Sequence, residues 1–175
     1  MVKKNKAIFF DRDGTLIKTF VSKKNIPIAI KNIKDLRFEN YANLVINKLR
    51  HKYYIFIITN QPDVSRGKNT KKNVVLINSV IKTKLKIDKI FTSYSDNEKN
   101  FMRKPNPGMI YKAKKIYDLN LKKSYVVGDR CKDILAGKKS MCKTILINKK
   151  YNSKINIIPD FKINNLKDLL LIIKV

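Results

Sequence analysis

The chain has 175 residues, 43% of them hydrophobic, and its 40 lysine and arginine residues against 13 acidic ones give a formal net charge of +27. This length predicts a single domain, residues 1–175, with a hydrophobic core. No apolar run approaches the roughly 20 residues of a membrane-spanning helix, so we expect no membrane association. We also expect the chain to be a cytoplasmic monomer.

The basic residues are spread along the whole chain and form no long block or arginine-rich arm. We therefore favour a solvated basic surface that attracts polyanions non-specifically over a dedicated nucleic-acid site. The two cysteines, Cys131 and Cys142, are too few for a disulfide framework or, with His51 as the sole histidine, for a four-ligand metal site.

The first apolar run, Ala7–Phe10, predicts a buried strand that stops at two aspartates. The segment 16–38 is polar and lysine-rich without a helical period, which predicts an ordered loop or flap over the edge of the sheet. Apolar residues at helical spacing after Asn40, an acceptable N-cap, predict a helix that ends near His51.

The rest of the chain alternates predicted strands and helices, apart from an irregular polar segment at 92–102. The predicted strands are 54–58, 87–91, 124–128, 144–147 and 160–163, and the predicted helices are 70–85, 109–117, 134–140 and a short one around 166–170. This alternation predicts an α/β fold with a doubly wound, Rossmann-like parallel sheet.

Polar residues follow three of these strands directly. They are Asp11, Asp13, Thr59, Asn60 and Asp129. The carboxyl ends of parallel strands lie along one edge of such a sheet, so these side chains should converge. Lys104, which precedes a proline-stiffened helix start, can join them.

This set contains the groups that phosphoryl transfer requires. Asp11 can attack phosphorus, while Asp13 can protonate the leaving alkoxide and later activate water. The carboxylates of Asp11 and Asp129 suit Mg²⁺, and Lys104 with the Thr59 hydroxyl can stabilise the phosphate oxygens. The lack of a Gly-x-x-x-x-Gly-Lys loop argues against a P-loop kinase. Each position also has a plain structural explanation as a turn, a strand end or a helix cap.

Four motifs in order resemble those of the haloacid dehalogenase superfamily of phosphohydrolases: Asp11-Arg12-Asp13-Gly14-Thr15, Thr59-Asn60, Lys104-Pro105 and Gly128-Asp129 with Asp133. More narrowly, the chain resembles the group of heptose-bisphosphate 7-phosphatases and histidinol-phosphatases. The residues that carry this closer resemblance are Phe10–Gly14, Thr59-Asn60-Gln61 with Ser65-Arg66-Gly67, Arg103–Met109 and Val127–Asp129. The resemblance implies the haloacid dehalogenase fold with a minimal cap formed by loops.

The resemblance also implies roles for single residues. Asp11 would be the nucleophile that forms an aspartyl-phosphate, and Asp13 the general acid and base, with a backbone carbonyl that also binds Mg²⁺. Asp129 would be the second metal carboxylate, with Asp133 supporting the site from behind. The implied phosphate-stabilising residues are Thr59 and Lys104, and the implied substrate-binding residues are Asn60, Gln61, Arg103 and Arg130.

Two departures from the group bear on the substrate. Segment 92–102 has neither Cys nor His where many members of the group carry a zinc loop, so no zinc is expected. Pro62 replaces the small polar residue that usually follows Thr-Asn-Gln in the group. The expected function is a Mg²⁺-dependent phosphomonoesterase for a small sugar phosphate, with D-glycero-D-manno-heptose 1,7-bisphosphate as the leading candidate. The alternatives are a histidinol-phosphate phosphatase, a polynucleotide 3′-phosphatase suggested by the charge, and a catalytically silent binding protein.

Overall fold

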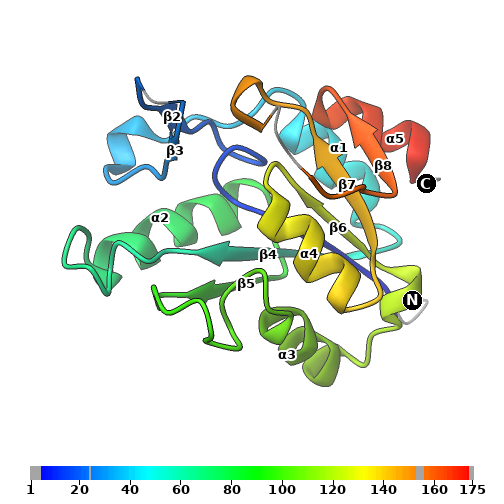
Figure 1. The fold of residues 1–175 in the computed structure, drawn as a ribbon. Helices are drawn as coiled ribbons and strands as arrows, with labels where there is room; N and C mark the ends of the chain where they lie inside the picture. The colour runs from blue at the N-terminus through cyan, green and yellow to red at the C-terminus, as the bar shows by residue number, and fades with distance from the viewer. Residues whose placement is uncertain (1–4, 24, 153–155, 174–175) are drawn as a thin grey trace.

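The structure, a computed structural model, describes residues 5–23, 25–152 and 156–173. Its centre is a six-stranded parallel sheet in the order β5-β4-β1-β6-β7-β8 (Figure 1). The strands are β1 (Ala7–Phe10), β4 (Tyr54–Asn60), β5 (Lys89–Ser93), β6 (Tyr125–Gly128), β7 (Lys143–Ile147) and β8 (Phe161–Ile163). This architecture confirms the predicted fold class.

Helices connect the strands and cover both faces of the sheet. The α-helices are α1 (Ala42–Leu49), α2 (Lys71–Lys84), α3 (Gly108–Tyr117), α4 (Cys131–Lys139) and α5 (Leu169–Ile172), and the short 3₁₀ helices are η1 (Ile33–Asp35), η2 (Leu121–Lys123), η3 (Lys150–Asn152) and η4 (Leu166–Asp168). Among the described helices, none has the length and apolar content needed to cross a bilayer.

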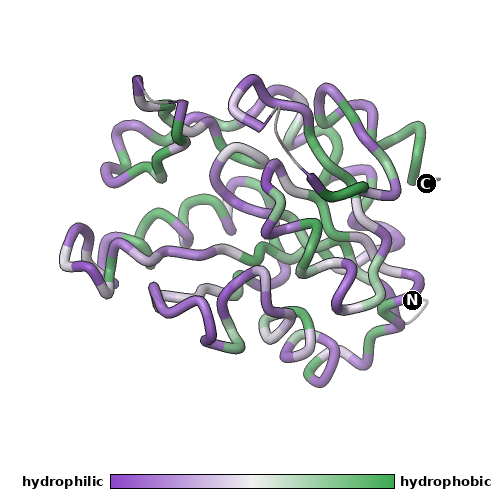
Figure 2. The backbone as a smooth tube through the Cα atoms, viewed as in Figure 1, coloured by the Kyte–Doolittle hydropathy of each residue, from purple (hydrophilic) through white to green (hydrophobic). Residues whose placement is uncertain are grey.

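Strand β1 shows why the sheet is buried on both faces. Ile8 and Phe10 pack into a cluster with apolar residues of α1, α2 and α5, whereas Ala7 and Phe9 pack into a second cluster with residues of α3 and α4. A strand covered on both sides needs apolar residues at every position, which is why it reads as a continuous run. Figure 2 shows hydrophobic residues along the central strands.

The predicted flap contains a small antiparallel hairpin, β2 (Phe20–Val21) with β3 (Pro27–Ile28). The hairpin stands near the carboxyl ends of the central strands (Figure 1), and Arg130 Nη2 donates a hydrogen bond of 3.1 Å to the Pro27 carbonyl. Strands of two residues are too short to give an alternating pattern, so the sequence predicts the flap without the hairpin.

Several predicted boundaries are wrong, for identifiable reasons. Asn40 does not cap α1, because the helix begins at Ala42 and the cap position is Tyr41, with a left-handed φ of 66°. Strand β5 lies two residues later than predicted, since Asp88 bonds to the backbone of Ile55 instead of joining the strand. Helix α4 begins at Cys131, three residues early, because a carboxylate in its first turn caps it.

The buried sheet predicts a large penalty for truncating a central side chain. Ile57 in β4 is fully buried, so Ile57→Ala should lower the free energy of unfolding by about 2–5 kcal/mol. Leu171→Ala in α5 is the control, because that side chain is 84% exposed and its loss should change stability by less than about 0.5 kcal/mol. Urea titrations of both variants measure the difference, and equal losses would contradict the packing described.

Candidate active site

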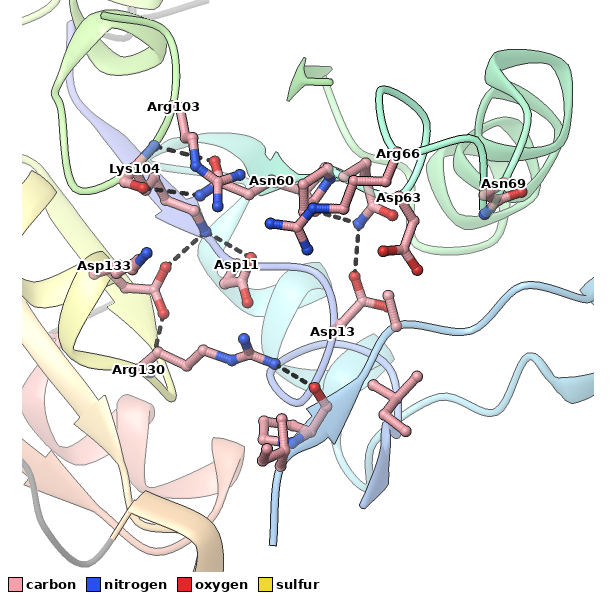
Figure 3. A pocket seen from close by; sticks show the side chains of 18 of the residues that line it. Asp11, Asp13, Asn60, Asp63, Arg66, Asn69, Arg103, Lys104, Arg130 and Asp133 are labelled. Carbon is pink, nitrogen blue, oxygen red and sulfur yellow. Dashed lines mark hydrogen bonds and ion pairs between the residues drawn. The ribbon is translucent and has the colours of Figure 1, made fainter. Parts of the chain in front are cut away.

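A cavity of about 500 Å³ opens at the carboxyl edge of the sheet. Its floor includes Asp11 and Thr59 at the ends of β1 and β4, and residues 26–29 of the hairpin segment form part of its wall. Figure 3 shows side chains from these separate elements pointing into the same space. The volume falls within the range of pockets that bind small molecules.

Three carboxylates gather at this edge: Asp11, Asp129 and Asp133 each place an oxygen within 4.8 Å of the others, and all three are buried. Burial raises the pKa of Asp11 and raises that of Asp129 to about 7, and the neighbouring carboxylates push both in the same direction. Crowded, buried negative charge of this kind favours binding of a cation with a preference for oxygen ligands.

Lys104 holds two of these carboxylates. Its buried Nζ donates hydrogen bonds of 2.6 Å to Asp11 Oδ1 and to Asp133 Oδ1, and one of 2.8 Å to the Ile58 carbonyl. Burial alone would lower the pKa of Lys104, but attraction to Asp11 and Asp133 outweighs it and raises the pKa above its ordinary value. The ammonium therefore stays charged.

Asn60 positions Lys104. The side-chain amide of Asn60 donates to the Lys104 carbonyl at 2.9 Å and accepts from the Lys104 amide at 3.0 Å. Asn60 lines the cavity as predicted, but in this structure both hydrogen bonds of its amide are to the backbone of the lysine.

Asp133 links Lys104 to the start of α4. Its second oxygen, Oδ2, accepts a hydrogen bond of 3.0 Å from the backbone amide of Arg130. A Cβ on Gly128 would lie 2.4 Å from the Asp133 side chain, so the close packing of β6 against this carboxylate requires glycine. With both oxygens engaged, Asp133 is suited to holding the lysine.

Asp13 lies apart from the three gathered carboxylates. Its carboxylate accepts hydrogen bonds of 2.9 and 3.2 Å from Arg12, a fully buried residue that also donates to Asn78. Gln61 Nε2 donates to Asp13 Oδ2 and to Thr59 Oγ1, both at 2.9 Å. The sequence alone assigns no role to Arg12 or Asn78, although a charged residue directly between two site aspartates is a usable signal.

Three arginines surround the mouth of the cavity: Arg66, Arg103 and Arg130 (Figure 3). Arg103 is buried and its Nη1 donates to the Ser95 carbonyl at 2.8 Å, but within the described residues its Nε has no hydrogen-bond partner. Burial and the neighbouring Arg66 lower the pKa of Arg103, and Arg66 itself pairs loosely with Asp96 at 3.5 Å. The cavity therefore has carboxylates at its floor and a basic rim formed by these three arginines.

Hydrogen bonds from asparagine hold the loop that carries Arg103. Asn106 Nδ2 donates to the carbonyls of Glu98 and Asn100 at 2.9 and 3.0 Å, and the Glu98 carboxylate pairs with Lys132 of α4 at 2.5 Å. These contacts bring the two ends of the loop together. That the loop needs no zinc stays a prediction.

In sequence and in fold, the chain is similar to known phosphatases. Residues 6–158 match the family model described as polynucleotide kinase 3 phosphatase. The chain is 31% identical to the D-glycero-alpha-D-manno-heptose-1,7-bisphosphate 7-phosphatase of Campylobacter jejuni over 95% of both chains, and 33% identical to that of Photorhabdus laumondii over 78% of this chain and 79% of the relative. A solved structure of D,D-heptose 1,7-bisphosphate phosphatase from B. bronchiseptica, complexed with magnesium and phosphate, has the same fold, with a TM-score of 0.81, 22% identity and coverage of 96% and 99%.

The raised pKa of Asp129 predicts how stability without divalent cations depends on pH. The folded state keeps the Asp129 proton up to about pH 7, whereas the unfolded carboxyl loses it near its ordinary pKa of 3.8. This contribution to stability is therefore complete below pH 3.8 and is lost as the pH rises through 7. Asp129→Asn removes the titrating group, so in EDTA its Tm should exceed that of the wild type at pH 8, and the excess should shrink toward pH 5.

Thermal unfolding across this pH range measures the effect. Asp35→Asn, at an exposed aspartate in η1, is the matched control and should follow the wild-type curve. Parallel curves for Asp129→Asn and the wild type would contradict the predicted burial of charge.

Proposed function

This chain belongs to the polynucleotide kinase 3 phosphatase family, within the haloacid dehalogenase phosphatases, and from that premise we propose that it removes the 7-phosphate of D-glycero-D-manno-heptose 1,7-bisphosphate. One observation carries the proposed chemistry: Lys104 and the carboxylates of Asp11, Asp129 and Asp133 meet at the edge of the sheet beside an open cavity. The names of the relatives supply the candidate substrate.

The proposed cofactor is Mg²⁺. Asp11, Asp129 and the backbone carbonyl of Asp13 would hold it, since this ion prefers oxygen ligands and the single ammonium of Lys104 cannot offset the charge of all three gathered carboxylates. When bound, the ion would offset the negative charge of the transferring phosphoryl group.

In the proposed reaction, a carboxylate oxygen of Asp11 forms a bond to phosphorus while the bond from phosphorus to the sugar oxygen breaks. Asp13 gives its proton to the departing alkoxide, and then takes a proton from the water that hydrolyses the aspartyl-phosphate. Inorganic phosphate leaves and the Asp11 carboxylate is restored. Lys104 and the Thr59 hydroxyl would stabilise the phosphate oxygens throughout.

Contacts around Asp13 hold in one position the carboxylate that would move the proton. Arg12 and Gln61 fix its carboxylate on the opposite side of the site from Lys104 (Figure 3). The nucleophile and the acid are thereby held by different cations, Lys104 for Asp11 and Arg12 for Asp13.

The basic rim supports a substrate with a second anionic group. The guanidinium groups of Arg103 and Arg130, which both line the cavity, offer donors outside the reaction centre, and charge-assisted bonds to phosphate are strong. Histidinol phosphate carries a cationic amine, which the cationic rim would repel. Binding of histidinol phosphate would therefore be disfavoured. A phosphorylated 3′-end of nucleic acid, consistent with the charge of +27, is the second candidate.

Asp11→Asn should abolish phosphate release, because an amide oxygen is a poor nucleophile and cannot form the aspartyl-phosphate. The measurement is release of inorganic phosphate from the heptose bisphosphate, histidinol phosphate and a 3′-phosphorylated oligonucleotide. The wild type should prefer the heptose bisphosphate. Full activity of Asp11→Asn would refute the mechanism, and faster turnover of the oligonucleotide would refute the substrate.

Arg103→Met should raise KM for the bisphosphate about 10- to 100-fold, since bonds to charged groups contribute about 1.5–3 kcal/mol. The effect on heptose 7-phosphate, which lacks the second phosphate, should be much smaller. Arg37→Met is the matched control, because the Arg37 guanidinium bonds to the carbonyls of Lys34 and Leu36 and the residue is exposed. Equal losses with both substrates would argue against a second-phosphate contact.

A further inference from the structure

The turn between β7 and β8 contacts Asp129 twice. In η3, the hydroxyl of Tyr151 donates a hydrogen bond of 2.6 Å to Asp129 Oδ2. The next residue, Asn152, uses its side-chain amide to donate to the backbone carbonyls of Asp129 and Ile147, both at 2.8 Å. The turn is thereby fixed to the carboxyl ends of β6 and β7.

The other oxygen of Asp129 has a donor of its own. Thr15 Oγ1 donates to Asp129 Oδ1 at 3.3 Å, a longer and weaker bond than that from Tyr151. Asp129 is fully buried, so its orientation is set by these two hydroxyls and its packing. The carboxylate is held firmly at Oδ2 and loosely at Oδ1.

Gly14 makes room for the arrangement. A Cβ at this position would lie 2.4 Å from the Tyr151 hydroxyl and 2.6 Å from Asp129 Oδ2. The φ of +85° at Gly14 also favours glycine. The loop after β1 therefore approaches the Tyr151–Asp129 pair too closely for any side chain.

We propose that Tyr151 is a positioning residue that fixes the Asp129 carboxylate so that the loosely held Oδ1 meets a divalent cation. The inference rests on the proposed role of Asp129 as a metal ligand. A carboxylate already held in one orientation loses less freedom when it binds metal. Removing a hydrogen-bond partner of a metal ligand commonly weakens metal binding about 10- to 100-fold.

Tyr151→Phe tests this directly, because it keeps the ring and removes the hydroxyl. Calorimetric titration with Mg²⁺ in the absence of substrate should give a Kd about 10-fold weaker than that of the wild type. Half-maximal activity should require correspondingly more Mg²⁺, with kcat at saturating Mg²⁺ close to the wild-type value. An unchanged Kd would overturn the inference, and so would a tighter one, which would mean that the hydroxyl competes with the cation.

Tyr111→Phe is the matched control. The Tyr111 hydroxyl donates to the Lys139 carbonyl at 3.0 Å, and Tyr111 does not line the candidate cavity. This variant should bind Mg²⁺ as the wild type does, and thermal unfolding in EDTA verifies that both variants are folded. If the wild type itself bound no Mg²⁺, the proposed function and this inference would both fail, whereas equal binding by the wild type and Tyr151→Phe would overturn this inference alone.

Discussion

The arrangement of the site depends on one buried ammonium group. Lys104 reaches from the segment before α3 to the ends of β1 and β4, where its three hydrogen bonds join Asp11, Asp133 and the Ile58 carbonyl. Without it, two carboxylates would lie unpaired in a buried position, which is strongly unfavourable. The same ammonium thus stabilises the folded site and supplies positive charge beside the proposed nucleophile.

The sequence predicts much of this site because the order of the parallel strands determines where the site residues lie. Continuous apolar runs identify strands buried on both faces, and the polar residues at or just after their carboxyl ends, such as Asp11, Thr59 and Asp129, must then lie at one edge. The structure places these three at that edge, together with Lys104. That part of the arrangement follows from the order of the strands.

Other features depend on side-chain contacts that no periodic pattern records. Tyr151 lies 22 residues beyond Asp129 in a turn without a motif, so its contact follows from the three-dimensional path of the chain alone. The pairing of Asp13 with Arg12 likewise depends on how a buried guanidinium is satisfied. Asn40 has the chemistry of a cap but lies outside the helix that it precedes, since Tyr41 turns the backbone first.

The place of β1 in the sheet has a consequence for how specificity can vary. β1 is hydrogen-bonded to β4 on one side and β6 on the other, so the backbone that carries Asp11 is fixed from both directions. The hairpin and the arginines that line the cavity instead lie on connecting segments at its mouth. Exchange of those segments can therefore change which molecule is accepted while the central strands keep the reaction geometry intact.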